Sequence, residues 1–118
     1  MALSIFVDGS GGPEAGFGFF VRETGESFYK KESNITNNQA EYMAIISVLK
    51  KFLGSMDEII IYSDSKNTVS QLNHEFAINN SQLRTLAMEA WQLTSKYPNL
   101  KIKWIPREEN LAGKMLGS

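Results

Sequence analysis

The chain has 118 residues, of which 42% are hydrophobic and 21% are charged, and its formal net charge is −1 at pH 7. This length suits one domain with its own core and is too short for two, so we expect a single domain over residues 1–118. The absence of cysteine excludes a disulfide framework and a thiolate metal site. The opening residues lack the basic start and long apolar run of a signal peptide or membrane span, which favours a cytoplasmic protein with no membrane partner.

Three β-strands are predicted at the start of the chain. Alternating apolar residues predict a first strand over residues 3–7, with Asp8 near its end. A glycine-rich turn leads to a second strand over residues 17–21, and a further turn leads to a third over residues 27–32. The glycine-rich turn lacks the Gly-Lys-Ser/Thr ending of a P-loop. The three strands are therefore expected to form an antiparallel set.

Helices and strands alternate through the rest of the chain. Residues 38–52 carry apolar side chains over a wide arc, which indicates a buried helix. The uninterrupted run Ile59-Ile60-Ile61 indicates a central strand with parallel neighbours. The remaining predicted elements are a short helix over 65–72 capped by Ser63 or Asp64, an amphipathic helix over 81–97, a strand over 100–104 ended by Pro106, and a very short helix from Asn110. Trp91 and Trp104 are expected in the core or against the sheet.

This order predicts an α/β fold with a mixed five-stranded sheet. Three antiparallel strands are followed by two parallel additions, helices cover both faces, and the C-terminal helix is short. Open sheets of this kind bind ligands outside the carboxyl ends of their parallel strands. Asp8 and Asp64 lie near such ends, and Glu41 lies near the start of a helix. Three converging carboxylates are the donors that a hard divalent cation requires, which predicts a metal centre.

Each of these acids also has a purely structural interpretation. Asp8 could be a turn residue before glycine. Asp64 could cap the following helix, and Glu41 could complete a capping box with Asn38. Capping does not explain why all three acids belong to elements that converge on one sheet edge. The metal centre is therefore the favoured interpretation.

Four sequence blocks resemble the type 1 ribonuclease H family when they are taken in order: FVDGS, ITNNQAEYMAI, IIIYSDSKNTVSQLN and WIPREEN. The resemblance extends from Ala2 to about Leu116. It implies a ribonuclease H-like fold and an endonuclease that hydrolyses the RNA strand of RNA/DNA hybrids, leaving 5′-phosphate and 3′-hydroxyl ends. It also implies two Mg²⁺ ions, with Mn²⁺ as a possible substitute, held by the catalytic residues Asp8, Glu41 and Asp64. We expect the protein to act as a monomer.

The resemblance further implies a groove that distinguishes RNA from DNA through the 2′-hydroxyl groups. The residues that match hybrid-contacting positions are Gly9, Ser10, Thr36, Asn37, Asn38, Gln39 and Asn80. Among these, Thr36 and Asn80 match positions that hold a phosphate of the DNA strand. Turn and helix-cap chemistry is the alternative interpretation for the three asparagines.

Two features depart from the family pattern. Only residues 74–79 occupy the place where many members have a basic helix and loop that grips the hybrid. Lys114 stands where the family has a fourth acid, and an ammonium group there would repel bound cations. The sequence therefore leaves two functions open. The favoured one is a hybrid-specific endonuclease with three acids, and the alternative is a catalytically impaired hybrid-binding domain.

Overall fold

The computed structural model describes the chain from residue 1 to residue 116; residues 117 and 118, which end the expected domain, lie outside the described residues. The elements in chain order are β1 (Ala2–Ser10), β2 (Gly16–Val21), β3 (Ser27–Lys31), α1 (Asn37–Lys51), β4 (Glu58–Ser63), α2 (Lys66–Leu72), α3 (Ser81–Thr94), β5 (Leu100–Trp104), the 3₁₀ turn η1 (Arg107–Glu109) and α4 (Leu111–Leu116). Every strand predicted from the sequence is present within a few residues of its expected bounds.

The five strands form one mixed sheet in the order β3-β2-β1-β4-β5. The first three are antiparallel neighbours, whereas β4 runs parallel to both β1 and β5. This confirms the predicted fold class. It also confirms that the β-branched run of β4 lies between two parallel neighbours. Because β1 and β4 are parallel, their carboxyl ends lie at the same edge of the sheet.

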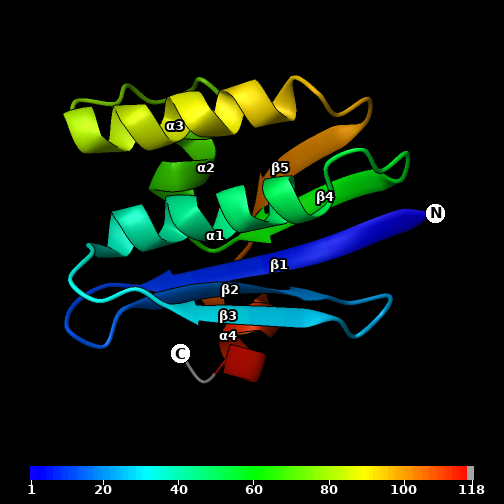
Figure 1. Cartoon of the computed structure of the whole chain (residues 1–118), viewed down its shortest axis with the longest axis horizontal. Helices are drawn as coiled ribbons and strands as arrows, with labels where there is room; N and C mark the ends of the chain where they lie inside the picture. The colour runs from blue at the N-terminus through cyan, green and yellow to red at the C-terminus, as the bar shows by residue number, and fades with distance from the viewer. Residues whose placement is uncertain (117–118) are drawn as a thin grey trace.

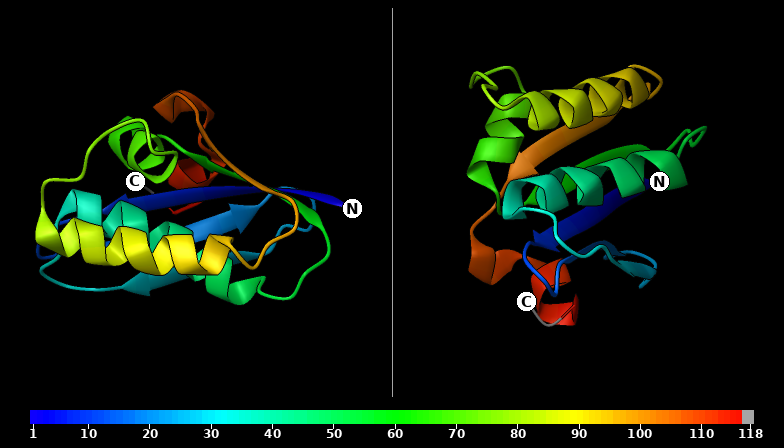
Figure 2. Two further views of the ribbon diagram at one scale, coloured as in Figure 1. Left: turned by 90° about the horizontal axis from the view of Figure 1, so that it is seen from above. Right: turned by 60° about the vertical axis from the view of Figure 1, so that its left-hand side comes forward.

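Helices cover both faces of this sheet, as predicted (Figure 1). α1, α2 and α3 lie on one face, and the short α4 packs against β1 and β2 on the other. The right-hand view in Figure 2 shows the same separation, with α4 (red) below the strands and α1 and α3 above them. Among the described residues, no helix has the length and apolar character needed to cross a membrane.

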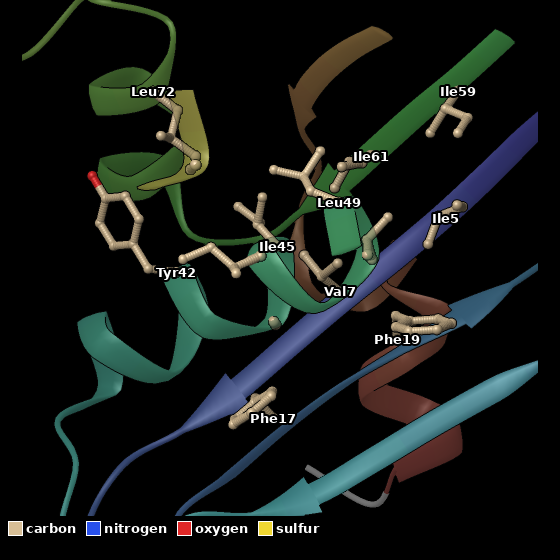
Figure 3. Packing of buried hydrophobic residues seen from close by; sticks show 14 of the residues in the cluster. Ile5, Val7, Phe17, Phe19, Tyr42, Ile45, Leu49, Ile59, Ile61 and Leu72 are labelled. Carbon is tan, nitrogen blue, oxygen red and sulfur yellow. The ribbon is translucent and has the colours of Figure 1, made fainter. Parts of the chain in front are cut away.

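The main core lies between α1 and the inner face of the sheet (Figure 3). Alternate residues of the two central strands, among them Ile5, Val7 and Ile61, are fully buried against Ile45 and Leu49 of α1. Burying each such side chain contributes about 1.5–3 kcal/mol to folding. The apolar pattern that predicted the strands therefore also fixes α1 on the sheet.

Several helix boundaries differ from the sequence prediction. α3 ends at Thr94 rather than at residue 97. The amides of Lys96 and Tyr97 bond to carbonyls three residues back instead of four, and Pro98 disfavours helical angles at Tyr97. α2 begins at Lys66, and its cap is Ser65, whose hydroxyl accepts from the Thr68 amide, rather than Ser63 or Asp64. Proline and serine thus decide these ends locally.

The two tryptophans have different environments. Trp91 packs against the core as expected, and its indole N–H donates to the Leu72 carbonyl at 3.1 Å. Trp104 is 46% exposed, so its expected burial is wrong. It is the last residue of β5, which is an edge strand of the sheet, and its N–H donates to the Asp64 carbonyl.

Candidate metal centre

Three carboxylates meet at the edge of the sheet where β1 and β4 end. Asp8 lies in β1 opposite Gly18, Asp64 follows the last residue of β4, and Glu41 lies just beyond the first turn of α1. One oxygen from each carboxylate lies within 4.8 Å of the others. The parallel pairing of β1 with β4 and the start of α1 at the same edge bring together residues that are far apart in sequence.

Burial and repulsion from neighbouring carboxylates raise the pKa values of two of these acids, Asp8 and Glu41. Asp8 is 4% exposed and Glu41 is 7% exposed. Burial, assisted by the charges of Asp8 and Asp64, raises the pKa of Glu41 to about 8. Burial and the charge of Asp64 also raise the pKa of Asp8 to about 6, although Arg107 opposes this shift. Oxygen donors that repel one another in a buried site fit a hard divalent cation, which would neutralise them.

The structure contradicts the structural interpretation of each acid. The capping box of α1 is formed by Thr36 and Gln39, so Glu41 takes no part in it. Ser65 rather than Asp64 caps α2. Asp8 is inside a paired strand and is not a turn residue. The three acids are therefore held together for a reason other than helix capping or turn formation.

Hydrogen bonds hold Glu41 in place. The hydroxyl of buried Ser63 donates to Glu41 Oε2 at 3.4 Å and accepts from the amide of Ser65 at 3.0 Å. The backbone N–H of Gly9 also bonds to the Glu41 carboxylate, which lowers its pKa in part. The sequence indicated Ser63 only as a possible cap of α2, and its contact with Glu41 was not predicted.

Glycine allows β1 to approach α1 closely enough to form this site. A Cβ atom added to Gly9 would lie 2.5 Å from the carbonyl carbon of Ala40, in the backbone of α1. A Cβ on Gly11 would lie 2.4 Å from the amide nitrogen of Asn37. Any larger residue at these positions would push the start of α1, and Glu41 with it, away from Asp8.

Asn110 is a further site residue that the sequence indicated only as a helix start. Its side chain is fully buried. The amide Nδ2 donates to the Val7 carbonyl at 2.9 Å and to Asp64 Oδ2 at 3.0 Å. Its Oδ1 accepts from the Ala112 amide at 3.0 Å, at the start of α4. Asn110 therefore connects β1, an acidic residue of the site and α4.

The residues predicted to contact the substrate belong to the end of β1 and the starts of α1 and α3. Gly9 and Ser10 end β1, and Asn37 and Asn38 form the first turn of α1. Asn80 caps α3 by accepting from the Leu83 amide at 3.0 Å. Three further contacts connect these segments. Thr36 and Gln39 form the capping box of α1, the Gly11 amide donates to Asn37 Oδ1, and Gln39 Nε2 donates to Gln82 Oε1. These contacts place the starts of α1 and α3 and the end of β1 on one surface; contact with substrate stays a prediction.

The two departures from the family pattern have clear structural positions. Residues 73–80 contain no helix or strand, so only a short loop follows α2. Lys114 lies on α4 and its side chain is exposed. The cation that acts on Asp8 is Arg107. The effect of Lys114 on bound metal stays a prediction.

Comparison with known proteins gives a consistent result. Residues 10–117 match the model of the family described as "Reverse transcriptase-like". The chain is 31% identical over 122 residues to the "Putative hydrolase EbsB" of Enterococcus faecalis, covering 97% of this chain and 90% of that protein. It is also 31% identical over 107 residues to ribonuclease HI of Halobacterium salinarum, covering 90% of this chain and 48% of that protein, so it spans about half of this relative.

Solved structures show the same likeness. RNase H1 from the halophilic archaeon Halobacterium salinarum superposes with a TM-score of 0.87 at 25% identity, covering 98% of this chain and 94% of that one. The structure of LC11-RNase H1 in complex with an RNA/DNA hybrid superposes with a TM-score of 0.84, covering 97% and 92% of the two chains. At 23% identity, the second match concerns the fold alone.

Proposed function

Because the chain belongs to the type 1 ribonuclease H family, we propose that it hydrolyses the RNA strand of RNA/DNA hybrids at the centre formed by Asp8, Glu41 and Asp64. The observation that carries this proposal is the convergence of the three carboxylates within 4.8 Å of one another at one sheet edge. The family match supports the reaction class, and the convergence supports this location for it.

The three carboxylates fit two Mg²⁺ ions, for which Mn²⁺ could substitute. When bound, such ions would supply neutralisation of the scissile phosphate and a lowered pKa of the attacking water. Asp8, Glu41 and Asp64 would hold these ions, and the family resemblance implies that Asp8 is the ligand shared between them. Gly9 and Ser63 orient Glu41. The expected products carry 5′-phosphate and 3′-hydroxyl ends.

The surface beside the acids accounts for selection of an RNA strand. Backbone and amide groups of Gly9, Ser10, Asn37, Asn38 and Gln39 would meet consecutive 2′-hydroxyl groups. Asparagine and glutamine amides suit this task because they both donate and accept hydrogen bonds, as a hydroxyl does. Thr36 and Asn80, which cap α1 and α3, would hold a DNA phosphate at two helix starts.

The test is cleavage of a hybrid whose RNA strand is end-labelled, with single-stranded RNA and duplex DNA of the same sequence for comparison. Asp8→Asn and Asp64→Asn each remove a charged ligand and keep the side-chain shape, so both should abolish cleavage. Asp57→Asn is the matched control, because Asp57 pairs with the N-terminal amine away from the site. Undiminished cleavage by either site variant would refute the proposal.

The second candidate is a hybrid-binding domain with little turnover. The observation that favours it is Lys114, which stands at the position of the family's fourth acid. The two functions separate in one experiment, in which Mg²⁺ and Mn²⁺ are each titrated against both hybrid binding and hybrid cleavage. Binding without cleavage at any concentration of either ion would establish the second function.

A further inference from the structure

Asn110 makes more contacts than a helix cap requires. Capping α4 needs only the side-chain oxygen, which accepts from the Ala112 amide. Serine, threonine and aspartate provide such an oxygen as well as asparagine does. The side-chain NH₂ group of Asn110 donates two other hydrogen bonds, one to the Val7 carbonyl and one to Asp64 Oδ2. Among the residues that cap helices well, only asparagine can accept at one end and donate twice at the other.

These two donated bonds join the two strands that carry the acids. Val7 is the residue before Asp8 in β1, and Asp64 follows β4. Asp64 is only half-buried, so its carboxylate has more freedom than those of Asp8 and Glu41. A carboxylate with one bond to Oδ2 keeps lone pairs for a cation. The Asn110 amide therefore restricts the rotation of Asp64 without blocking its use as a ligand.

We propose that Asn110 is a positioning residue that fixes the Asp64 carboxylate for metal binding and makes that binding depend on the docking of α4. The inference rests on the proposed function, since it concerns metal held at the same centre. α4 packs against β1 and β2, and its residue Ala112 is fully buried there. The family has an acid on its terminal helix where this chain has Lys114. In this chain α4 would instead contribute to the metal centre through Asn110, the residue that caps it.

The test uses Asn110→Ser, which keeps a capping oxygen but is too short to donate to both Val7 and Asp64. Mn²⁺ and Mg²⁺ binding is measured by calorimetry without nucleic acid, and thermal unfolding is measured in EDTA. The Kd for Mn²⁺ should rise about tenfold, as is typical when a group that orients a metal ligand is lost. Hybrid cleavage should recover at saturating Mn²⁺, which an unfolded variant would not do.

Asn73→Ser is the matched control. It removes a comparable amide bond, from Asn73 Nδ2 to the Ile102 carbonyl at 3.0 Å, which joins the end of α2 to β5. Both variants should lower the Tm, but only Asn110→Ser should weaken Mn²⁺ binding. If the serine variant does not fold, Asn110→Thr fills more of the space, still caps α4 and carries the same expectation.

The outcomes separate this inference from the proposed function. A parent protein that binds Mn²⁺ and cuts the hybrid, with an unchanged Kd for Mn²⁺ in Asn110→Ser or Asn110→Thr, overturns the role of Asn110 alone. A parent protein that binds neither Mn²⁺ nor Mg²⁺ overturns the proposed function, and this inference with it. If the Kd for Mn²⁺ rises as much in Asn73→Ser as in Asn110→Ser, the loss of metal binding follows from lower stability in general, and the inference is also overturned.

Discussion

At the scale of single residues, the buried carboxylates Asp8 and Glu41 should destabilise the metal-free protein as pH rises. Their pKa values are raised to about 6 and about 8, so between roughly pH 4 and pH 8 the folded protein binds more protons than the unfolded chain. The free energy of unfolding should therefore fall through this window, by about 1 kcal/mol or more. Urea unfolding in EDTA at a series of pH values measures it.

Glu41→Gln tests the origin of this dependence. The variant removes the acid whose pKa is raised further. The free energy of unfolding should therefore depend less on pH, and the metal-free protein should be more stable near pH 8. Glu75→Gln, at an exposed position, is the control and should leave the profile unchanged. A parent protein whose stability rises between pH 5 and pH 8 would contradict the predicted sign.

A second residue-scale prediction concerns Lys114. If its ammonium acts on the metals, Lys114→Asp changes the local charge by two units. At an effective dielectric near 20, one unit charge at some 5 to 6 Å is worth roughly 3 kcal/mol before screening. The Mg²⁺ concentration for half-maximal cleavage should then fall and the rate should rise, about tenfold if ~1.4 kcal/mol is recovered. Identical Mg²⁺ titrations of the two proteins would show that Lys114 does not act on the site.

The acids could be predicted from the sequence because each stands at a recognisable strand end or helix start. Ser63 and Asn110 could not, because their roles depend on long-range contacts. Asn110 contacts the Val7 carbonyl 103 positions away in the chain, and no local pattern encodes that bond. The sequence predicted that a short terminal helix begins at Asn110, and it could not show which groups the side-chain amide of Asn110 contacts.

At the scale of elements, hydrophobic periodicity predicted the strands well, and local chemistry decided the boundaries that differed. The apolar pattern continues to Tyr97, yet α3 ends at Thr94, because Pro98 follows. Three neighbouring polar residues could have capped α2, and backbone geometry selects Ser65. Periodicity reports which side chains are buried, whereas an end is decided by one or two backbone hydrogen bonds.

The contact between β1 and α1 supports a third prediction. Gly9→Ala places a methyl group against the Ala40 backbone, so it should destabilise the protein by about 1–3 kcal/mol and weaken Mn²⁺ binding by displacing Glu41. Gly25→Ala is the control, because Gly25 has a positive φ but open space around it. It should cost stability without changing Mn²⁺ binding. Equal effects of the two variants on Mn²⁺ binding would refute the steric explanation.

At the scale of the whole molecule, four of the lysines are already paired with acids of this chain, which lowers what they contribute to a hybrid bound at Asp8, Glu41 and Asp64. Lys50 and Lys51 end α1, about 14 Å along the helix from Glu41, and pair with Glu89 and Glu26. Lys30 and Lys31 pair with Glu32 and Glu14. Lys66 is different, because it starts α2 next to Asp64 and its exposed side chain lies over the Trp104 ring.

This distribution gives the last prediction. With about three phosphates neutralised, the log of the hybrid affinity should fall with the log of the salt concentration at a slope of about −3. The inactive Asp8→Asn variant and a labelled hybrid allow fluorescence anisotropy to measure this slope over a KCl series. Adding Lys66→Gln should reduce the slope by about one, whereas adding Lys50→Gln should leave it unchanged, because Lys66 is close to Asp64 and Lys50 lies at the far end of α1. Tight binding that does not respond to salt, or an equal effect of the two lysines, would mean that the hybrid is held on a different face of the protein.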